Sequence, residues 1–348
     1  MDGADTHQTE LLCRACGGQT RFDPEARGLK CTSCGTVRDL SHPDDARAAD
    51  EAPYDPDRPC TEAQVIDGTH VHACQTCGGE VVFTGASVSD RCPYCDGAVV
   101  LGPEGASYPA MALIPFDLGQ SAAPTLAQFW ASRRIAAPSD LERAVAEGRV
   151  AGLYAPFWTF DSEEAVTYWA RYNERGRDKV RVKSIRGRMT THFDDLLVPA
   201  SHHVTPLIRD GILHDFQPER LRAFQPGFLA GFAAERHHQT VAEGLRANED
   251  DKGVLMRNRI KRYEGRHDLY DIGYRTDTTG IHYRRILLPV WIVHYQYRDK
   301  PYKIVVSGID GRTFGERPFS MWKLAGYAGL LTALTMAVGV AWGALAVM

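Results

Sequence analysis

The segment Cys13-Arg14-Ala15-Cys16 is followed after 14 residues by Cys31-Thr32-Ser33-Cys34, and this pattern occurs twice in the chain. The second copy consists of Cys74-Gln75-Thr76-Cys77 and Cys92-Pro93-Tyr94-Cys95, with the same 14-residue gap, 61 residues further along. Each C-x-x-C pair places two sulfur atoms on one tight turn, and two such pairs can surround a metal ion as a tetrahedron. The duplication therefore predicts two tandem metal-binding modules.

Two zinc ribbons are predicted, one over residues 10–40 and one over residues 70–102. We expect two Zn²⁺ ions per chain, each held by four thiolates, with the ligands Cys13, Cys16, Cys31, Cys34, Cys74, Cys77, Cys92 and Cys95. Because four sulfur ligands leave no open position for water, each zinc should be structural rather than catalytic. Redox-active cysteine pairs and iron–sulfur ligation are the alternatives, and the matched spacing of the two copies favours zinc over both.

The segment between the two predicted ribbons, residues 41–69, is rich in Asp, Pro and Ala and is expected to be a flexible acidic linker. It contains Cys60, which stands outside the four pairs, and His70 and His72 come just before the second copy of the motif. Exchange of these groups with the thiolate ligands is one interpretation. Since each ribbon already has four thiolates, we favour an unreactive cysteine and solvent-exposed histidines.

Charge is distributed unevenly along the 348 residues, whose formal net charge is −4. Residues 1–104 hold 8 basic and 18 acidic side chains, whereas the remainder holds 32 basic and 26 acidic ones. Phosphate binding depends on Lys and Arg, so the acidic ribbon region argues against a nucleic-acid partner. Thiolate ligands need a reducing compartment, and the polar first ten residues lack the apolar core of a signal peptide.

One C-terminal transmembrane helix is predicted over residues 322–348. Residues 324–348 contain no charged side chain and would form about 37 Å of helix, against a hydrocarbon core of about 30 Å. The indoles of Trp322 and Trp342 would lie near opposite interfaces of the bilayer. Because Lys323 and two arginines precede the span, the positive-inside rule predicts a single-pass protein of the inner cell membrane with its bulk in the cytoplasm.

Small residues recur at every fourth position of this segment from Ala325 to Ala341, and Gly339 with Gly343 forms a G-x-x-x-G pattern. Such stripes allow two helices to approach closely in lipid. Self-association through this helix, or its packing on a partner helix, is one interpretation of the pattern. Chance is the other, because Ala and Gly are common in such segments.

The middle of the chain, residues 107–318, is predicted to be an α+β domain with an antiparallel sheet. An apolar run at 112–116 precedes an amphipathic stretch that contains Phe129 and Trp130. A second helix is expected to begin at a capping box formed by Ser139 and Glu142. Three β-rich runs follow, at 153–160, 165–172 and 180–190.

The later part of this domain is expected to be mainly helical over residues 204–264 and to return to strands over residues 281–314. An Asp310-Gly311 pair predicts a hairpin turn within the second of these segments. The tripeptides Pro156-Phe157-Trp158 and Pro289-Val290-Trp291 resemble one another and are candidates for corresponding positions in one antiparallel sheet.

Four basic residues, Arg177, Lys179, Arg181 and Lys183, alternate along one predicted strand and therefore share one face. Near a membrane these side chains could meet anionic headgroups. The more common role of such charges is to keep a strand face solvated and to discourage pairing with other strands.

No catalytic motif is evident, since the sequence lacks a phosphate-binding loop, an H-E-x-x-H and a G-x-S-x-G. We therefore expect that the protein is not an enzyme. Three residue pairs could be recruited by a metal, namely Asp194-Asp195, His202-His203 and His237-His238. Isolated pairs of this kind are usually caps, turns or surface residues.

The double ribbon, the segment Tyr154-Ala155-Pro156-Phe157-Trp158 and the segment Leu288-Pro289-Val290-Trp291 carry a family resemblance over most of the chain. The chain resembles the bacterial TFIIB-type double-zinc-ribbon membrane proteins, which are often labelled primosomal protein N′ or replication factor Y. A helicase needs a phosphate loop, which this sequence lacks, so we do not expect helicase activity. Some relatives look like membrane partners of phage-shock-protein-A-type envelope-stress systems, which implies a scaffold role.

Together these observations predict a tail-anchored zinc-ribbon adaptor that recruits proteins to the cytoplasmic face of the membrane. Its expected partners are the lipid bilayer and other proteins at the membrane. The alternative is a membrane-tethered nucleic-acid-binding factor associated with replication or transcription.

Overall fold

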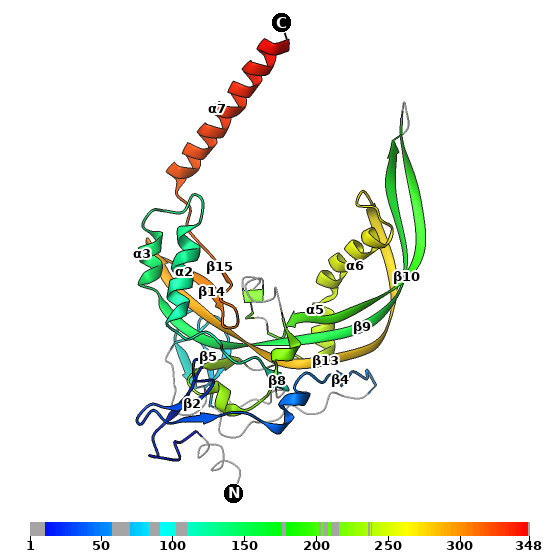
Figure 1. Cartoon of the computed structure of the whole chain (residues 1–348). Coiled ribbons are helices and arrows are strands. Elements are labelled where there is room, and N and C mark those ends of the chain that lie inside the picture. Colours follow the sequence, from blue (N-terminus) through cyan, green and yellow to red (C-terminus); the bar gives the residue numbers. More distant parts are fainter. Residues whose placement is uncertain are drawn as a thin grey trace.

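The computed structural model of the chain describes residues 11–57, 70–83, 91–101, 110–175, 179–201, 203–204, 208–209, 216–235, 237 and 239–346. Within these ranges the backbone forms a three-stranded sheet near the N-terminus and one twelve-stranded sheet through the rest of the body (Figure 1). The pairings are antiparallel apart from two short parallel contacts, β12 with β9 and β13 with β8. The predicted antiparallel sheet is thus confirmed. Cys60, Arg177, His202 and His238 lie outside the described residues.

Three long strands form the centre of the large sheet, β9 (Arg149–Arg175), β10 (Val180–Pro199) and β13 (Tyr270–Tyr297). Strand β9 pairs antiparallel with both β13 and β10. Two of the predicted runs, 153–160 and 165–172, belong to this one strand. The first run is buried throughout, whereas in the second only every other residue is buried. This change is expected where a strand runs from a region in which both of its faces are covered into a region in which only one face is covered.

The two faces of the central sheet carry different units, because residues of odd and even number in β9 point to opposite sides. On one face, Tyr154 belongs to a core cluster with Trp130 of α2, Val145 of α3, and Phe22 near the N-terminus. On the other face, Leu153 belongs to a core cluster that includes Val81 and Tyr94, which lie within the second copy of the cysteine motif. The strands of the two N-terminal units and the two helices on the central sheet are β1 (Thr20–Asp23), β2 (Gly28–Cys31), β3 (Val37–Asp39), β5 (His70–Cys74), β6 (Glu80–Phe83), β7 (Val99–Leu101), α2 (Ala122–Ser132) and α3 (Leu141–Ala146).

The two N-terminal units are joined to the body in different ways. Strands β1, β2 and β3 form the separate small sheet, whose link to the body includes a hydrogen bond of 2.9 Å from the Phe22 amide to the Ala230 carbonyl. Strands β5, β6 and β7 instead continue the large sheet, because β6 pairs with β12 (Ala233–Glu235), which also pairs with β9. The second unit therefore shares its backbone hydrogen bonds with the central domain.

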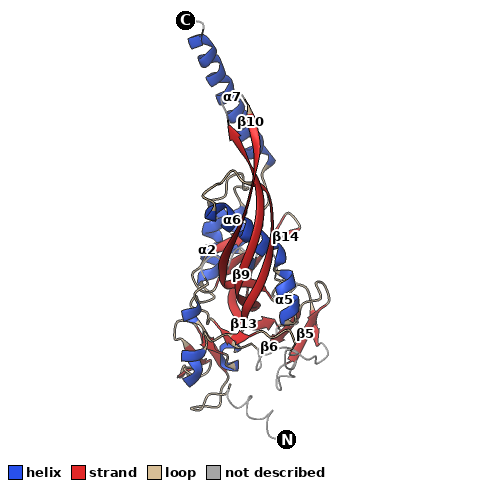
Figure 2. Ribbon diagram, turned by 90° about the vertical axis from the view of Figure 1, so that its right-hand side faces the viewer, coloured by secondary structure: helices blue, strands red, loops and turns tan. Residues whose placement is uncertain are grey.

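The far halves of β9 and β10 extend from the body as a long arm (Figures 1 and 2). Helix α6 (Glu249–Tyr263) covers the base of this arm, where its Met256 and Ile260 pack against Val166 and Tyr168. It follows helix α5 (Val241–Ala247), which begins with a complete capping box formed by Thr240 and Glu243. The capping box predicted for α3 is wrong, because its N-cap residue is Asp140, whose carboxylate accepts from the Tyr297 hydroxyl at 2.9 Å and caps no backbone amide of the helix.

The structure differs from the expected flexible linker in the described part of residues 41–57. This segment packs on the body, because the Arg284 side chain of β13 donates to the Ala49 carbonyl at 2.7 Å and forms an ion pair with Glu51 at 3.0 Å. It also pairs with β13 through a short strand. Its elements are η1 (Pro43–Arg47) and β4 (Ala52–Pro53).

The expected helical character of residues 204–264 holds for α5 and α6 and fails in residues 216–235. There the chain forms η3 (Pro218–Arg220), β11 (Arg222–Ala223), η4 (Pro226–Leu229) and β12. Pro218 and Pro226 each stand at the start of a 3₁₀ turn, a position that proline favours, and prolines at this spacing prevent a continuous helix.

The later strands agree with the sequence. Strand β14 pairs with β15, and Gly311 adopts φ = 75° in the turn that joins them, so the predicted hairpin is confirmed. The tripeptides that contain Trp158 and Trp291 do lie in adjacent antiparallel strands, although they are not directly opposite one another. The remaining strands are β8 (Ala112–Leu113), β14 (Lys300–Ser307) and β15 (Thr313–Gly315).

Helix α7 (Met321–Ala346) leaves the body as a separate element (Figures 1 and 2). Its segment Met321–Gly339 is long and apolar enough to cross a membrane, and none of it is buried within the protein. Leu330 and Leu331 are 66% and 63% exposed. Within the described residues this is the single candidate for a membrane span.

Candidate metal centres

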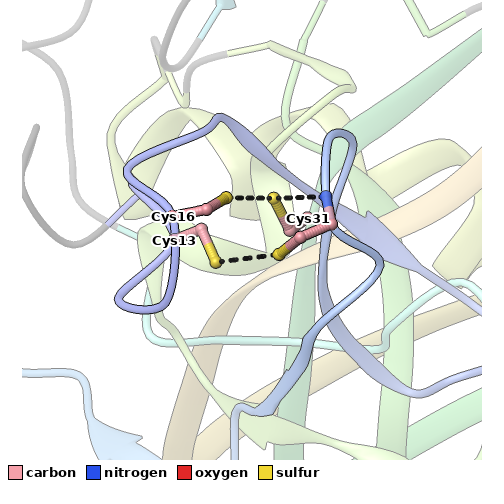
Figure 3. Close-up of side chains that lie close together, drawn as sticks. Cys13, Cys16 and Cys31 are labelled. Carbon is pink, nitrogen blue, oxygen red and sulfur yellow. Dashed lines mark hydrogen bonds between the residues drawn. The ribbon is translucent and has the colours of Figure 1, made fainter.

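The structure brings all eight predicted ligands together as two quartets. In the first quartet (Cys13, Cys16, Cys31 and Cys34), Cys13 and Cys16 come from a turn before β1, and Cys31 ends β2 (Figure 3). The Sγ atoms of Cys16 and Cys31 are 3.5 Å apart, and those of Cys13 and Cys34 are 3.6 Å apart. One tight turn therefore faces another across the end of a small sheet.

The second quartet (Cys74, Cys77, Cys92 and Cys95) repeats this geometry. The Sγ atoms of Cys74 and Cys95 are 3.5 Å apart, and those of Cys77 and Cys92 are 3.7 Å apart. Cys74 ends β5, just as Cys31 ends β2 in the first quartet. Burial distinguishes the two, because Cys92 is fully buried at 0% exposure against the central domain, whereas Cys16 and Cys34 are exposed.

Both quartets fit a four-coordinate zinc ion. A tetrahedron with zinc–sulfur bonds of about 2.3 Å has sulfur atoms about 3.8 Å apart, close to the distances found here. In each quartet all four sulfur atoms lie within 4.8 Å of one another. Disulfides do not fit, because a sulfur–sulfur bond is about 2.05 Å long and these cysteines are free. Each donor set can thus hold one metal ion, for which zinc is well suited.

The turns that carry the cysteines have the same backbone shape in all four cases. The residue after each second cysteine has a positive φ, with values of 72°, 74°, 73° and 63° at Gly17, Gly35, Gly78 and Asp96. Amide groups in these turns point at sulfur, as in the 3.4 Å contact from the Ser33 amide to Cys31 Sγ. The glycines that repeat in the sequence serve this geometry, since glycine adopts a positive φ without strain.

Asp96 replaces glycine at the fourth turn, and its carboxylate has a second role. It forms ion pairs with Arg91, at 3.2 Å, and with Arg149 at the start of β9. Asp tolerates the left-handed conformation better than most residues. The substitution therefore ties the last turn of the second quartet to the central sheet.

Hydrogen bonds prepare some of the thiols to bind a metal. The hydroxyl and the backbone of Thr36 lower the pKa of Cys34 to about 6, with the hydroxyl 3.2 Å from Cys34 Sγ. At Cys74 burial raises the pKa of the thiol, but hydrogen bonds from backbone amides outweigh burial and lower the pKa to about 7. Thiolates, not thiols, bind metal, so these groups favour the ligating form near neutral pH.

A buried polar cluster holds the second quartet against the central domain. Tyr94, which lies between Cys92 and Cys95, donates a hydrogen bond to Glu235 of β12, and Ser201 donates to the other oxygen of the same carboxyl group. Glu235 is 2% exposed, and burial raises its pKa to about 7. The sequence analysis missed this cluster, because only the fold brings positions 94, 201 and 235 together.

The histidines near the second quartet do not complete a metal site among the described residues. His72 lies on β5 and is buried at 7% exposure, so the expectation that it faces solvent is wrong. His237 is 1% exposed, and its Nε2 lies 3.2 Å from the Phe157 carbonyl. The ring of His203 packs near Tyr94, with ring centroids 6.0 Å apart. These contacts give the histidines packing roles.

Asp195 has a structural role, whereas Asp194 lies with Asp161 and His192 in a group whose ligand atoms are within 4.8 Å of one another. The Asp195 amide donates to Asp161 at 2.8 Å, and its carboxylate pairs with the buried Arg284. Glu51, Asp161 and Asp195 are close enough to hold a cation, but the Arg284 guanidinium already provides positive charge to this group. Arg284 itself was not singled out by the sequence analysis.

A groove of about 830 Å³ lies between the two quartet-bearing units and the central sheet. Its lining combines the basic side chains Arg21, Lys30, Arg91 and Arg149 with the aromatic rings of Phe22, Phe232 and Trp291. Asp23 and Glu25 add acidic groups at one side. A mixed lining of this kind can receive a segment of another polypeptide, with apolar contacts at the floor and charges at the rim.

Comparison with known proteins yields one relative of nearly full length. No family model matches the chain, and no solved structure matches it. The uncharacterized protein YdjG of Bacillus subtilis (strain 168) is 24% identical over 326 residues, which cover 90% of this chain and 92% of that protein. This similarity leaves the activity open.

Proposed function

We propose that the protein is a tail-anchored adaptor of the inner cell membrane, whose two zinc-stabilised units recruit another protein at the cytoplasmic face. The observation that carries this proposal is the arrangement of the molecule. The quartet-bearing units lie at one end of the body, and helix α7 leaves from the other (Figures 1 and 2). An anchored body of this shape presents the two units and the groove between them away from the bilayer.

Zinc acts in this proposal as a structural element of tandem ribbons. Each quartet offers four sulfur ligands and leaves no position for a substrate or a water molecule. The units carry few buried apolar residues of their own, so metal binding supplies part of their folding free energy. We accordingly assign no catalytic role to either centre.

The groove is the proposed recruiting surface. Arg21 and Arg91 are exposed at its rim, and an acidic segment of a partner would complement them. The resemblance to double-zinc-ribbon membrane proteins favours a partner of the phage-shock-protein-A type, in an envelope-stress system.

A co-purification experiment on the full chain from detergent extract tests recruitment. We expect a phage-shock-protein-A-type partner to co-purify with the wild-type chain after nuclease treatment. The variant Gln120→Trp, which places a large side chain at an exposed position in the groove lining, should lose the partner. Gln217→Trp is the matched control, because Gln217 is also exposed in a loop and does not line the groove. Equal loss in both variants, or in neither, would contradict recruitment through the groove.

The rival function is a membrane-tethered nucleic-acid-binding factor. Counterion release makes such binding fall steeply with salt, and the net charge of −10 over residues 1–104 opposes it even at low salt. We expect no appreciable binding of DNA or RNA through residues 1–104 at about 0.15 M salt. Any weak binding by the chain should map to Arg177, Lys179, Arg181 and Lys183. Tight, salt-dependent binding in a gel-shift titration would promote the rival.

A further inference from the structure

The arm formed by the far ends of β9 and β10 is strongly basic. We define the basic arm as residues 171–175 and 179–188, which contain seven basic side chains and one acidic side chain. All seven are exposed, namely Arg171, Arg175, Lys179, Arg181, Lys183, Arg186 and Arg188. The proposed recruitment of a partner through the groove does not involve these side chains.

Few carboxylates neutralise the basic arm. Lys183 pairs with Glu174 at 2.7 Å, and Arg171 pairs with Asp271 at 3.2 Å. Among the described residues, the other five cations form no ion pair with a carboxylate. Repulsion between them would be relieved by an anionic partner.

The basic arm also exposes apolar side chains next to its charges. Val180 and Val182 are 60% and 62% exposed, and Trp169 is 43% exposed. Val180 lies opposite Arg175, and Trp169 lies opposite Arg186, so apolar and basic side chains share one face of the hairpin. Valine and tryptophan beside arginine suit the boundary between headgroups and acyl chains of a bilayer.

The far part of the arm lacks the support of the rest of the sheet. Strand β13 begins to pair with β9 at Tyr270, opposite Arg171, so beyond this point only β9 and β10 are paired. An isolated two-stranded hairpin is marginally stable in water. Contact with a surface would order this part of the arm.

The position of the basic arm relative to α7 indicates that this surface is a membrane. In both views the arm extends from the body on the same side as α7, and its far end is level with the first turns of that helix (Figures 1 and 2). Trp322 and Lys323 stand in these first turns, where a helix that crosses a bilayer meets the headgroups. With α7 inserted at a tilt, so that the bilayer lies across the view of Figure 1, the basic arm is level with the headgroup layer.

We propose that the basic arm is a second membrane contact, which binds anionic lipid headgroups beside the inserted α7. This inference rests on the proposed membrane insertion of α7. Two separated contacts would fix the orientation of the body relative to the bilayer more firmly than α7 alone. The orientation of the groove between the quartets would then be set by lipid composition.

Hydrogen exchange of the full chain in lipid nanodiscs tests this inference. One set of discs contains phosphatidylcholine alone, and the other also contains phosphatidylglycerol. We expect the amides of peptides within residues 164–190 to exchange about tenfold more slowly in the anionic discs. High salt, at about 0.5 M, should abolish the difference because it screens exposed charges.

Charge-reversal variants supply the control. Lys179→Glu/Arg181→Glu/Arg186→Glu should remove the lipid-dependent protection, whereas Arg27→Glu/Arg47→Glu/Arg222→Glu, with the same change in charge on exposed residues of the body, should retain it. Unchanged exchange in α6 would show that the arm variant is folded. Equal exchange in both kinds of disc would overturn the inference while leaving insertion of α7 intact.

Two other outcomes would also be decisive. A chain that does not co-elute with the discs would overturn insertion of α7 and the second contact together. Protection of the arm by a single-stranded oligonucleotide in neutral discs, without protection by anionic lipid, would assign the arm to nucleic acid and overturn the lipid contact.

Discussion

At the scale of single residues, the environment of each sulfur atom explains why the two quartets need not behave alike. Cys92 is buried and lies two residues from Tyr94, which is hydrogen-bonded to the central domain. Cys16 and Cys34 lie at the exposed side of a small separate sheet. Loss of metal at the second quartet should therefore disturb the body more than loss at the first.

We expect the purified chain to contain two zinc ions and the variant Cys77→Ser to contain one, because a serine hydroxyl does not form the anionic ligand that zinc needs. Cys77→Ser should also speed hydrogen exchange in β12, which pairs with β6, whereas the matched variant Cys16→Ser should not. Elemental analysis and exchange mass spectrometry measure these effects. An iron–sulfur absorption band, or full zinc content in Cys77→Ser, would refute the assignment.

Glu235 should make stability depend on pH. Burial raises the pKa of its carboxyl group from 4.5 to about 7, so the folded chain keeps a proton that the unfolded chain releases. This contribution to the free energy of unfolding is present below pH 4.5 and falls as the pH rises through about 7. Glu235→Gln resembles the protonated form and should remove this part of the pH dependence, as measured by thermal unfolding in detergent between pH 5.5 and 8.

A second variant separates titration from packing at this site. Glu235→Ala leaves the hydroxyls of Tyr94 and Ser201 without their acceptor and should cost about 1–3 kcal/mol at all pH values. If Glu235→Gln destabilised the chain as much as Glu235→Ala does, the carboxyl group would not be protonated in the fold.

At the scale of elements, one arginine joins three segments that are distant in sequence. Arg284 of β13 is 6% exposed and contacts Ala49 and Glu51 ahead of β4, as well as Asp195 of β10. The acidic segment 41–57 is ordered by these contacts, although its composition is typical of a linker. A buried cation with two carboxylate partners thus adds to the apolar contacts that Ala48 and Tyr54 make with the body.

Arg284→Ala should lower the free energy of unfolding by about 3–5 kcal/mol, because it leaves two partly buried carboxylates without their cation. Arg275→Ala is the control, since Arg275 is an exposed residue of the same strand, and we expect a change within about 0.5 kcal/mol. Urea titration in detergent measures both variants. A similar small change in the two would show that the ion pairs do not hold residues 41–57 in place.

At the scale of the whole molecule, the chain has two ends with different surroundings. The quartet-bearing units and the acidic part of the sequence lie at one end, and α7 and the basic arm extend from the other (Figure 1). This polarity matches a membrane that carries negative charge and a cytoplasmic partner beyond it. It also means that the packing of the body depends little on α7, which is unburied and donates a hydrogen bond from Lys323 Nζ to the Ala137 carbonyl at 2.8 Å.

Deletion of residues 322–348 should therefore release the protein from membranes without unfolding the body. Cell fractionation with a high-salt wash measures this effect, and zinc content measures whether both quartets survive. The salt wash is needed because the basic arm would retain part of the truncated chain on anionic lipid at low salt. A truncated chain that still pellets after the wash would show that another element anchors the protein.

The sequence by itself determined the features whose signals are local. Ligand spacing grouped the eight cysteines correctly, since a C-x-x-C turn and a fixed gap leave few other arrangements. The Asp310-Gly311 hairpin and the apolar α7 were likewise predicted, because turn chemistry and a long uncharged run act within one segment. The predictions from composition were wrong where contacts between distant residues determine the local structure, as in residues 41–57 and 216–235.

Only the tertiary structure decided which distant residues meet. Strand pairing joined β6 to the central sheet through β12, buried Glu235 against Tyr94, and placed Arg284 beside Glu51 and Asp195. It also placed the basic arm on the same side as α7, so that one alternation of charges became part of the surface that we propose to contact the membrane. Such contacts are not visible in the sequence because pairing register and burial depend on free energies summed over the whole fold, not on any single segment.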